Sequence, residues 1–204
     1  VLNESAKVKI STYLKGAMRN GMTVLVHGFS TTVFYALKEC KKGGTNLNVL
    51  ITDCSPEHSG SKMKTALTEE GIKCEIISDL SVGYHMNNVD CVIVGANAIV
   101  ENGGVINRIG TYTLAIVAKN FKKPFYVLSE TLKFLKLYPL DQNDIPFNNA
   151  KSFENLGELT DWTDTNNKEK GTKEEFLDNM KGYKESICDY TPPEFISLVF
   201  TDNG

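Results

Sequence analysis

Residues 23–52 read TVLVHGFSTTVFYALKECKKGGTNLNVLIT and contain one complete strand–helix–strand unit. Two short apolar runs rich in β-branched residues, TVLVH at 23–27 and VLIT at 49–52, stand at its ends. Neither run alternates apolar with polar residues, which is typical of strands buried on both faces of a parallel sheet. The segment between them, STTVFYALKECKK, has helical character. The unit therefore predicts a βαβ crossover.

The same alternation continues along the chain. Further predicted strands are CEIIS at 74–78, CVIV at 91–94 and PFYVL at 124–128. Further predicted helices are GSKMKTALTEEG at 60–71, VINRIGTYTLAIVAKN at 105–120, and an opening helix from Asn3 to Asn20 that ends at Gly21. Repeated βαβ units predict an α/β fold with a doubly wound, mostly parallel, Rossmann-like sheet and helices on both faces. We assign residues 1–20 to a linker helix and residues 21–204 to a single domain.

The composition narrows the class of protein. The chain has 204 residues and a net charge of −3, which gives no reason to expect a nucleic-acid partner, and it has no apolar run long enough to span a membrane. Residues 141–190 hold 12 acidic and 6 basic side chains, which predicts a polar insertion at about 148–187, helical in part from Thr172 to Tyr183. The five cysteines lack CxxC spacing and the three histidines lie far apart, so we expect buried reduced thiols, a reducing compartment, and neither a metal nor a cofactor.

Polar residues follow the predicted strands, where open parallel sheets bind their ligands. His27, Ser30 and Thr31 follow the first strand, and Asn97, Glu101 and Asn102 follow the strand at 91–94. The predicted helix from Val105 would bring Asn107 and Arg108 into its first turns, where a guanidinium beside free helix amides suits a phosphate or a carboxylate. The Glu101 carboxylate and the side-chain amides of Asn97 and Asn102 could hold sugar hydroxyls. These eight residues form a candidate small-anion site.

Simpler interpretations stay open for the same residues. Gly103 and Gly104 could merely shape a turn, Arg108 could be a surface charge, and a strand-end histidine such as His27 is commonly a hydrogen-bonded core residue. The loop matches neither GxGxxG nor GxxxxGK[ST], so a dinucleotide or nucleoside triphosphate is not indicated. Residue chemistry alone predicts an α/β domain that binds a phosphorylated small molecule.

Residues 95–140 read GANAIVENGGVINRIGTYTLAIVAKNFKKPFYVLSETLKFLKLYPL, and DYTPPEFISLVFTDNG closes the chain. Both segments resemble the alpha subunits of eukaryotic translation initiation factor 2B, whose signature is close to GAEGVxENGGIINxIGT followed by KPFYVxxES-KF. The resemblance covers roughly residues 5–147 and 188–204 and leaves out the polar insertion. Family members begin with a helical domain, which the resemblance implies is missing here except for its connecting helix, and they continue past the closing segment.

The wider family includes methylthioribose-1-phosphate isomerase and ribose-1,5-bisphosphate isomerase. The resemblance implies a catalytic cysteine in a T-H-C-N loop and a catalytic aspartate in a G-A-D motif, where this sequence has Gly28 and Asn97. Neither replacement can supply the missing thiol or carboxyl group. The chain is therefore expected not to be an enzyme. Arg108 replaces the usual lysine, which keeps the positive charge of the phosphate-binding half of the pocket.

The resemblance implies a non-catalytic regulatory subunit of the guanine nucleotide exchange factor for initiation factor 2. Such a subunit is cytoplasmic, pairs with itself, assembles with beta and delta subunits and through them with gamma and epsilon, and senses phosphorylated initiation factor 2. We expect LKFLKLYPL at 132–140 and PPEFISLVF at 192–200 to form the homodimer interface, with core packing as the alternative for these runs. The alternative functions are a sugar-phosphate isomerase and a free-standing sugar-phosphate-binding protein.

Overall fold

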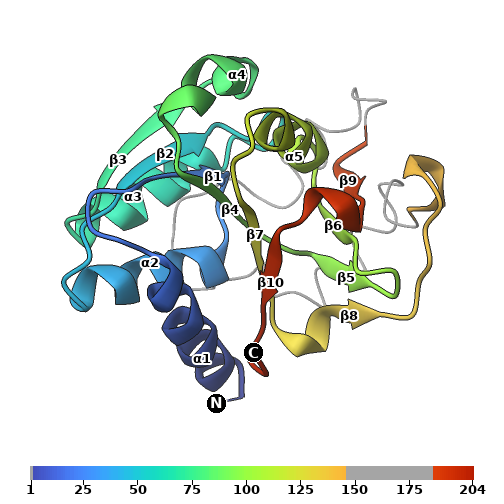
Figure 1. Cartoon of the computed structure of the whole chain (residues 1–204), viewed down its shortest axis with the longest axis horizontal. Coiled ribbons are helices and arrows are strands. Elements are labelled where there is room, and N and C mark those ends of the chain that lie inside the picture. Colours follow the sequence, from blue (N-terminus) through green and yellow to red (C-terminus); the bar gives the residue numbers. More distant parts are fainter. Residues whose placement is uncertain (1, 146–185) are drawn as a thin grey trace, which may run out of the picture.

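The computed structural model describes residues 2–145 and 186–204 (Figure 1). The main sheet has six parallel strands in the order β10-β7-β4-β1-β2-β3. These strands are β1 (Thr23–His27), β2 (Asn48–Thr52), β3 (Lys73–Ile77), β4 (Cys91–Gly95), β7 (Phe125–Leu128) and β10 (Leu198–Phe200). The order reverses between β1 and β4, which is the switch point of a doubly wound sheet, where such folds bind their ligands. The predicted α/β class is confirmed.

Helices cover both faces of this sheet, and each face has its own apolar core. The helices are α1 (Leu2–Ala17), α2 (Thr31–Lys42), α3 (Gly60–Glu69), α4 (Val82–His85) and α5 (Thr111–Asn120). Ile10 of α1, Leu37 of α2 and Met63 of α3 share one core, whereas Val82 of α4 and Leu114 of α5 belong to the other. Helix α1 also contacts β10, so segments from the two ends of the sequence lie side by side (Figure 1). None of the helices in the described ranges is long and apolar enough to cross a membrane.

A second, four-stranded sheet was not predicted, and it corrects one predicted helix. Its order is β8-β5-β6-β9, formed by β5 (Ala98–Val100), β6 (Val105–Arg108), β8 (Phe134–Leu135) and β9 (Cys188–Thr191). Figure 1 shows it at the side of the molecule away from β3. The helix predicted from Val105 is wrong, because its first four residues pair with β5 and β9 as a strand. Helix α5 begins only after Gly110, whose positive φ of 98° turns the chain.

One other boundary differs from the prediction. Helix α1 ends at Ala17 and not near Gly21, which takes a φ of 87° further along the chain. The predicted polar insertion at 148–187, with its helix at 172–183, lies outside the described residues except for Ser186 and Ile187.

Candidate functional site

The candidate site lies at the carboxyl ends of β1, β2 and β4, beside the base of the β5–β6 hairpin. His27 is the last residue of β1 and is 5% exposed. Its Nδ1 lies 2.6 Å from the Thr52 hydroxyl oxygen, and its Nε2 lies 2.8 Å from the Ile109 carbonyl oxygen. Since the carbonyl can only accept, Nε2 carries the proton and Nδ1 accepts from the hydroxyl. Burial lowers the pKa of His27, which keeps the ring neutral. His27 therefore joins three segments and supports the site without presenting a ring nitrogen to it.

Gly28 follows with a left-handed backbone and close neighbours. Its φ is +56°, and a Cβ built on it would lie 2.7 Å from Cys54 Cβ and 2.6 Å from Ser59 Oγ. The Cys54 thiol also lies 3.5 Å from His27 Nε2. Burial raises the pKa of this thiol to about 12, so it is neutral and a poor nucleophile. The space beside the backbone of residue 28 is filled by its neighbours.

Ser30 and Thr31 open α2 at the switch point. The Ser30 hydroxyl accepts from the Val33 backbone N–H at 3.4 Å and caps the helix, as the sequence indicated. A Cβ on Gly95, the last residue of β4, would lie 2.4 Å from Ser30 Oγ, so the cap stands directly against the end of that strand. Thr31 is the first helical residue and is exposed. This helix end supplies the backbone N–H groups that favour an anion.

The strand at 105–108 separates two residues that the predicted helix placed together. Successive side chains of a strand point to opposite faces, so Asn107 and Arg108 leave the backbone on opposite sides. Asn107 is buried, and its Nδ2 donates to the Thr111 hydroxyl at 3.0 Å. Arg108 faces the end of β1: its Nη1 donates to the Phe29 carbonyl, and its Nε faces the Glu57 carboxylate.

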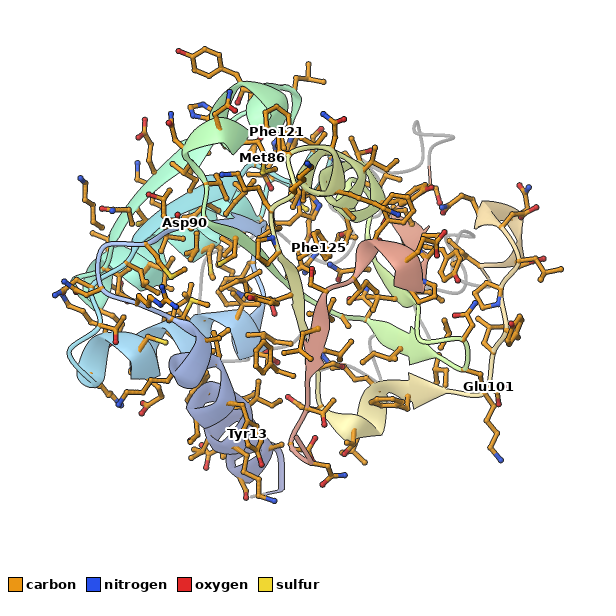
Figure 2. All side chains as sticks on the ribbon, in the orientation of Figure 1. Tyr13, Met86, Asp90, Glu101, Phe121 and Phe125 are labelled. Carbon is orange, nitrogen blue, oxygen red and sulfur yellow. The ribbon has the colours of Figure 1, made fainter. Side chains whose placement is uncertain are left out.

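The base and the tip of the β5–β6 hairpin hold the remaining predicted residues. Asn97 lies at the base, where its Nδ2 donates to the Cys188 sulfur at 3.4 Å. Glu101 and Asn102 lie in the turn at the tip, where Figure 2 shows Glu101 at the margin of the molecule. The Asn102 amide donates to the Tyr190 hydroxyl at 2.6 Å and to the Pro139 carbonyl at 3.2 Å, so it holds the turn. The structure thus brings Asn97 to the site and places Glu101 and Asn102 away from it.

Sequence reasoning missed three charged residues near these groups. Lys133 donates to the Ala96 carbonyl at 3.0 Å, and burial lowers its pKa. Glu57 belongs to the loop after β2 and pairs with Arg108, which no local sequence pattern indicates. Asp189 of β9 is 6% exposed, and its Oδ2 accepts from the backbone N–H groups of Gly110 and Tyr112 at 2.7 and 3.0 Å. The sequence signal that could have identified Asp189 as a residue of the site is its position in the closing DYT segment.

Chemically, the site offers a helix N-terminus, a guanidinium and amide groups around a neutral histidine and a neutral thiol. This set suits an anion with neighbouring hydroxyl groups. Neither thiol of the site is an ionised nucleophile, because burial raises the pKa values of Cys54 and Cys188 to about 12.

Comparison with known proteins places these features in a family. Residues 2–204 match the model of the initiation factor 2 subunit family. The chain is 40% identical over 200 residues to translation initiation factor eIF2B subunit alpha of Dictyostelium discoideum, and 31% identical over 201 residues to ribose 1,5-bisphosphate isomerase of Archaeoglobus fulgidus. Each alignment covers 98% of this chain and 59% of the relative, so the chain spans less than two thirds of their length.

Solved structures show the same fold. A crystal structure of the translation initiation factor eIF-2B from Pyrococcus horikoshii superposes with a TM-score of 0.75 at 24% identity, covering 98% of this chain and 64% of the other. A 5-methylthioribose 1-phosphate isomerase from the same organism gives 0.72 at 22% identity, covering 98% and 55%. The match over residues 2–204, together with the 40% identity to the Dictyostelium alpha subunit, shows that the chain belongs to the initiation factor 2 subunit family.

Proposed function

We propose that this chain is the α/β portion of an alpha-type regulatory subunit of the exchange factor that acts on initiation factor 2. In this proposal the subunit is not an enzyme; it assembles with beta and delta subunits in the cytoplasm, senses phosphorylated initiation factor 2, and keeps a sugar-phosphate pocket without turnover. The 40% identity to the Dictyostelium alpha subunit supports the assignment to a translation factor.

The geometry at Gly28 is the main support for the proposal that the subunit is not an enzyme. A side chain at this position would overlap Cys54 and Ser59, and the left-handed φ of +56° disfavours any residue other than glycine. Asn97 supplies an amide where the related isomerases are expected to have a carboxyl group, and an amide does not exchange protons as a general acid or base must. The pocket retains the groups that bind an anion, and at positions 28 and 97 it has neither the thiol nor the carboxyl group that the resemblance implies for the isomerases.

Capture of partners tests the regulatory role. We expect a tagged copy of the whole protein, purified from its own cells, to bring down beta, gamma, delta and epsilon exchange-factor subunits, identified by mass spectrometry. Recovery of the protein alone, with a bound sugar phosphate, would instead support the free-standing binding protein, and would contradict the translation role.

Self-association is proposed to use the exposed apolar side chains of two segments. Leu132, Phe134, Tyr138 and Leu140 are exposed on and around β8, and Leu198 is exposed on the edge strand β10. Leu132 and Leu140 are each 81% exposed, and exposed apolar side chains that gather in one area mark an interaction surface.

We expect Leu132→Asp to weaken the dimer by at least about 100-fold, because a carboxylate would lose its water at a covered apolar interface. Sedimentation velocity over a range of concentrations measures this change. Leu80→Asp is the matched control, since Leu80 is 98% exposed but lies beside α4. A wild-type monomer at high concentration, or a Leu132→Asp dimer as tight as the wild type, would contradict the interface.

A further inference from the structure

The positive charge of Arg108 is already met by a carboxylate within the protein. Arg108 Nε faces Glu57 Oε2, and the side chains of Arg108 and Glu57 are only 12% and 23% exposed. The Arg108 Nη1 donates to the Phe29 carbonyl, which fixes the guanidinium over the segment between β1 and α2. A guanidinium with so little contact with water requires a counter-charge, because an unpaired buried charge is costly.

The loop that carries Glu57 is anchored at both of its ends. Asp79 accepts from the backbone N–H groups of Cys54 and Ser55 at 2.9 and 2.8 Å. At the other end, the His58 Nδ1 lies 2.5 Å from an Asp53 carboxylate oxygen, and the Ser59 hydroxyl accepts from the Phe29 backbone N–H at 3.2 Å. These contacts hold the loop against the candidate site and leave the Glu57 side chain to reach Arg108.

A carboxylate and a phosphate compete for the same groups. Both are anions that accept hydrogen bonds from a guanidinium. The segment that accepts from Arg108, at Phe29, directly precedes the Ser30 cap, so the α2 N-terminus lies beside the ion pair. An anion at this helix end that reached the same guanidinium would also meet the Glu57 carboxylate, and two negative charges at one site repel each other.

We propose that Glu57 acts as an internal stand-in for the ligand's anion: it neutralises Arg108 in the empty pocket and must be displaced for a sugar phosphate to bind. This inference rests on the proposed sugar-phosphate pocket. Glu57 then weakens the affinity for the ligand, because part of the favourable binding free energy is used to break the Glu57–Arg108 ion pair. Binding also releases the loop at 53–59 from one of its contacts.

Titration calorimetry of the protein with ribose 5-phosphate, with inorganic phosphate and with uncharged ribose tests the displacement. We expect Glu57→Gln, which removes the charge and keeps the shape, to tighten ribose 5-phosphate and inorganic phosphate binding at least about fivefold. Uncharged ribose should show no such change. Arg108→Ala should abolish detectable binding of the phosphates, with circular dichroism used to confirm that the variant is folded.

Glu70→Gln is the matched control. Glu70 pairs with Lys38 at the far end of α3, so the same chemical change removes an ion pair without touching the pocket. Its affinity for ribose 5-phosphate should equal that of the wild type. An equal gain in both variants would show a general charge effect and would overturn the role of Glu57.

Hydrogen exchange of the wild type gives a second readout that needs no variant. The backbone N–H groups of Cys54, Ser55, Glu57 and His58 should exchange faster when ribose 5-phosphate is bound, because the loop loses its contact with Arg108. If the wild type binds ribose 5-phosphate but Glu57→Gln binds it no more tightly, the displacement is wrong and the pocket stands. If neither the wild type nor Glu57→Gln binds any of the phosphates, both the displacement and the pocket are wrong.

Discussion

Gly28→Ala is expected to lower the free energy of unfolding by about 3 kcal/mol, from backbone strain and overpacking together. The φ of +56° disfavours an L-residue, and the new Cβ would stand 2.7 Å from Cys54 Cβ, a position close to the backbone that cannot rotate away. Equilibrium unfolding in urea measures the loss. Gly44→Ala separates the two causes, since Gly44 has a φ of +85° but nothing within 4 Å of its Cβ position. That control should lose only about 1 kcal/mol.

The same contacts bear on the catalytic thiol that the resemblance implies for the related isomerases at the position of Gly28. We expect Gly28→Cys to be destabilised like Gly28→Ala and to remain inactive as an isomerase. Combining it with Cys54→Ala removes the sulfur that would lie 2.9 Å from the new Cβ, and should recover part of the stability. Gly28→Ala as stable as the wild type would show that the site has room for a side chain, and would remove the main support for a non-catalytic pocket.

The second large effect concerns the buried carboxyl group of Asp189. Burial raises its pKa to about 7, although backbone N–H groups at the start of α5 favour the charged form. Because the folded-state pKa lies above the ordinary value of 3.8, the folded chain binds more protons than the unfolded chain between about pH 4 and pH 7. The contribution of Asp189 to stability is therefore full below pH 4 and is lost as the pH rises through 7, by up to about 4 kcal/mol.

Asp189→Asn should remove this loss, because the amide stays neutral at every pH and its oxygen can still accept the two backbone hydrogen bonds. We expect the stability of the variant relative to the wild type to be higher at pH 8.5 than at pH 5 by about 3 kcal/mol, as measured by urea unfolding at both values. The lowered pKa of His27 also makes stability depend on pH, but it affects both proteins alike and cancels in the difference.

Asp202→Asn provides the contrasting control. The Asp202 carboxylate accepts from the backbone and the hydroxyl of Thr131 at 2.7 and 3.0 Å, and its pKa is lowered despite its partial burial, with the Thr131 hydrogen bonds favouring the charged form. Its substitution should therefore cost the same at pH 5 and pH 8.5. If Asp189→Asn showed the same stability difference from the wild type at both pH values, the raised pKa of Asp189 would be wrong.

The main sheet was predictable because its central strands are continuous apolar runs that only a sheet covered on both faces can bury. The second sheet was not, since β8 has two residues, β5 has three, and β9 comes after the polar stretch. At 105–120 the apolar pattern runs through both a strand and a helix, and the division at Gly110 depends on a backbone angle that the letters do not specify.

The candidate site was predictable only in part, for a related reason. Ser30 was placed correctly because a serine before an apolar helical segment is a local signal. The pairing of Arg108 with Glu57 depends on the tertiary fold, and nothing in the sequence near either residue indicates it. The strand at 105–108 likewise turned Asn107 away from Arg108, which only its pairing with β9 reveals.

The most direct test of the account measures binding and turnover on one sample of the protein. Ribose 1,5-bisphosphate is added, its binding is measured by calorimetry, and the conversion of aldose to ketose is followed by NMR over several hours. We expect saturable binding with no ketose formed. Ketose formation that is lost in Arg108→Ala would contradict a non-catalytic pocket, because the pocket would then be an isomerase active site.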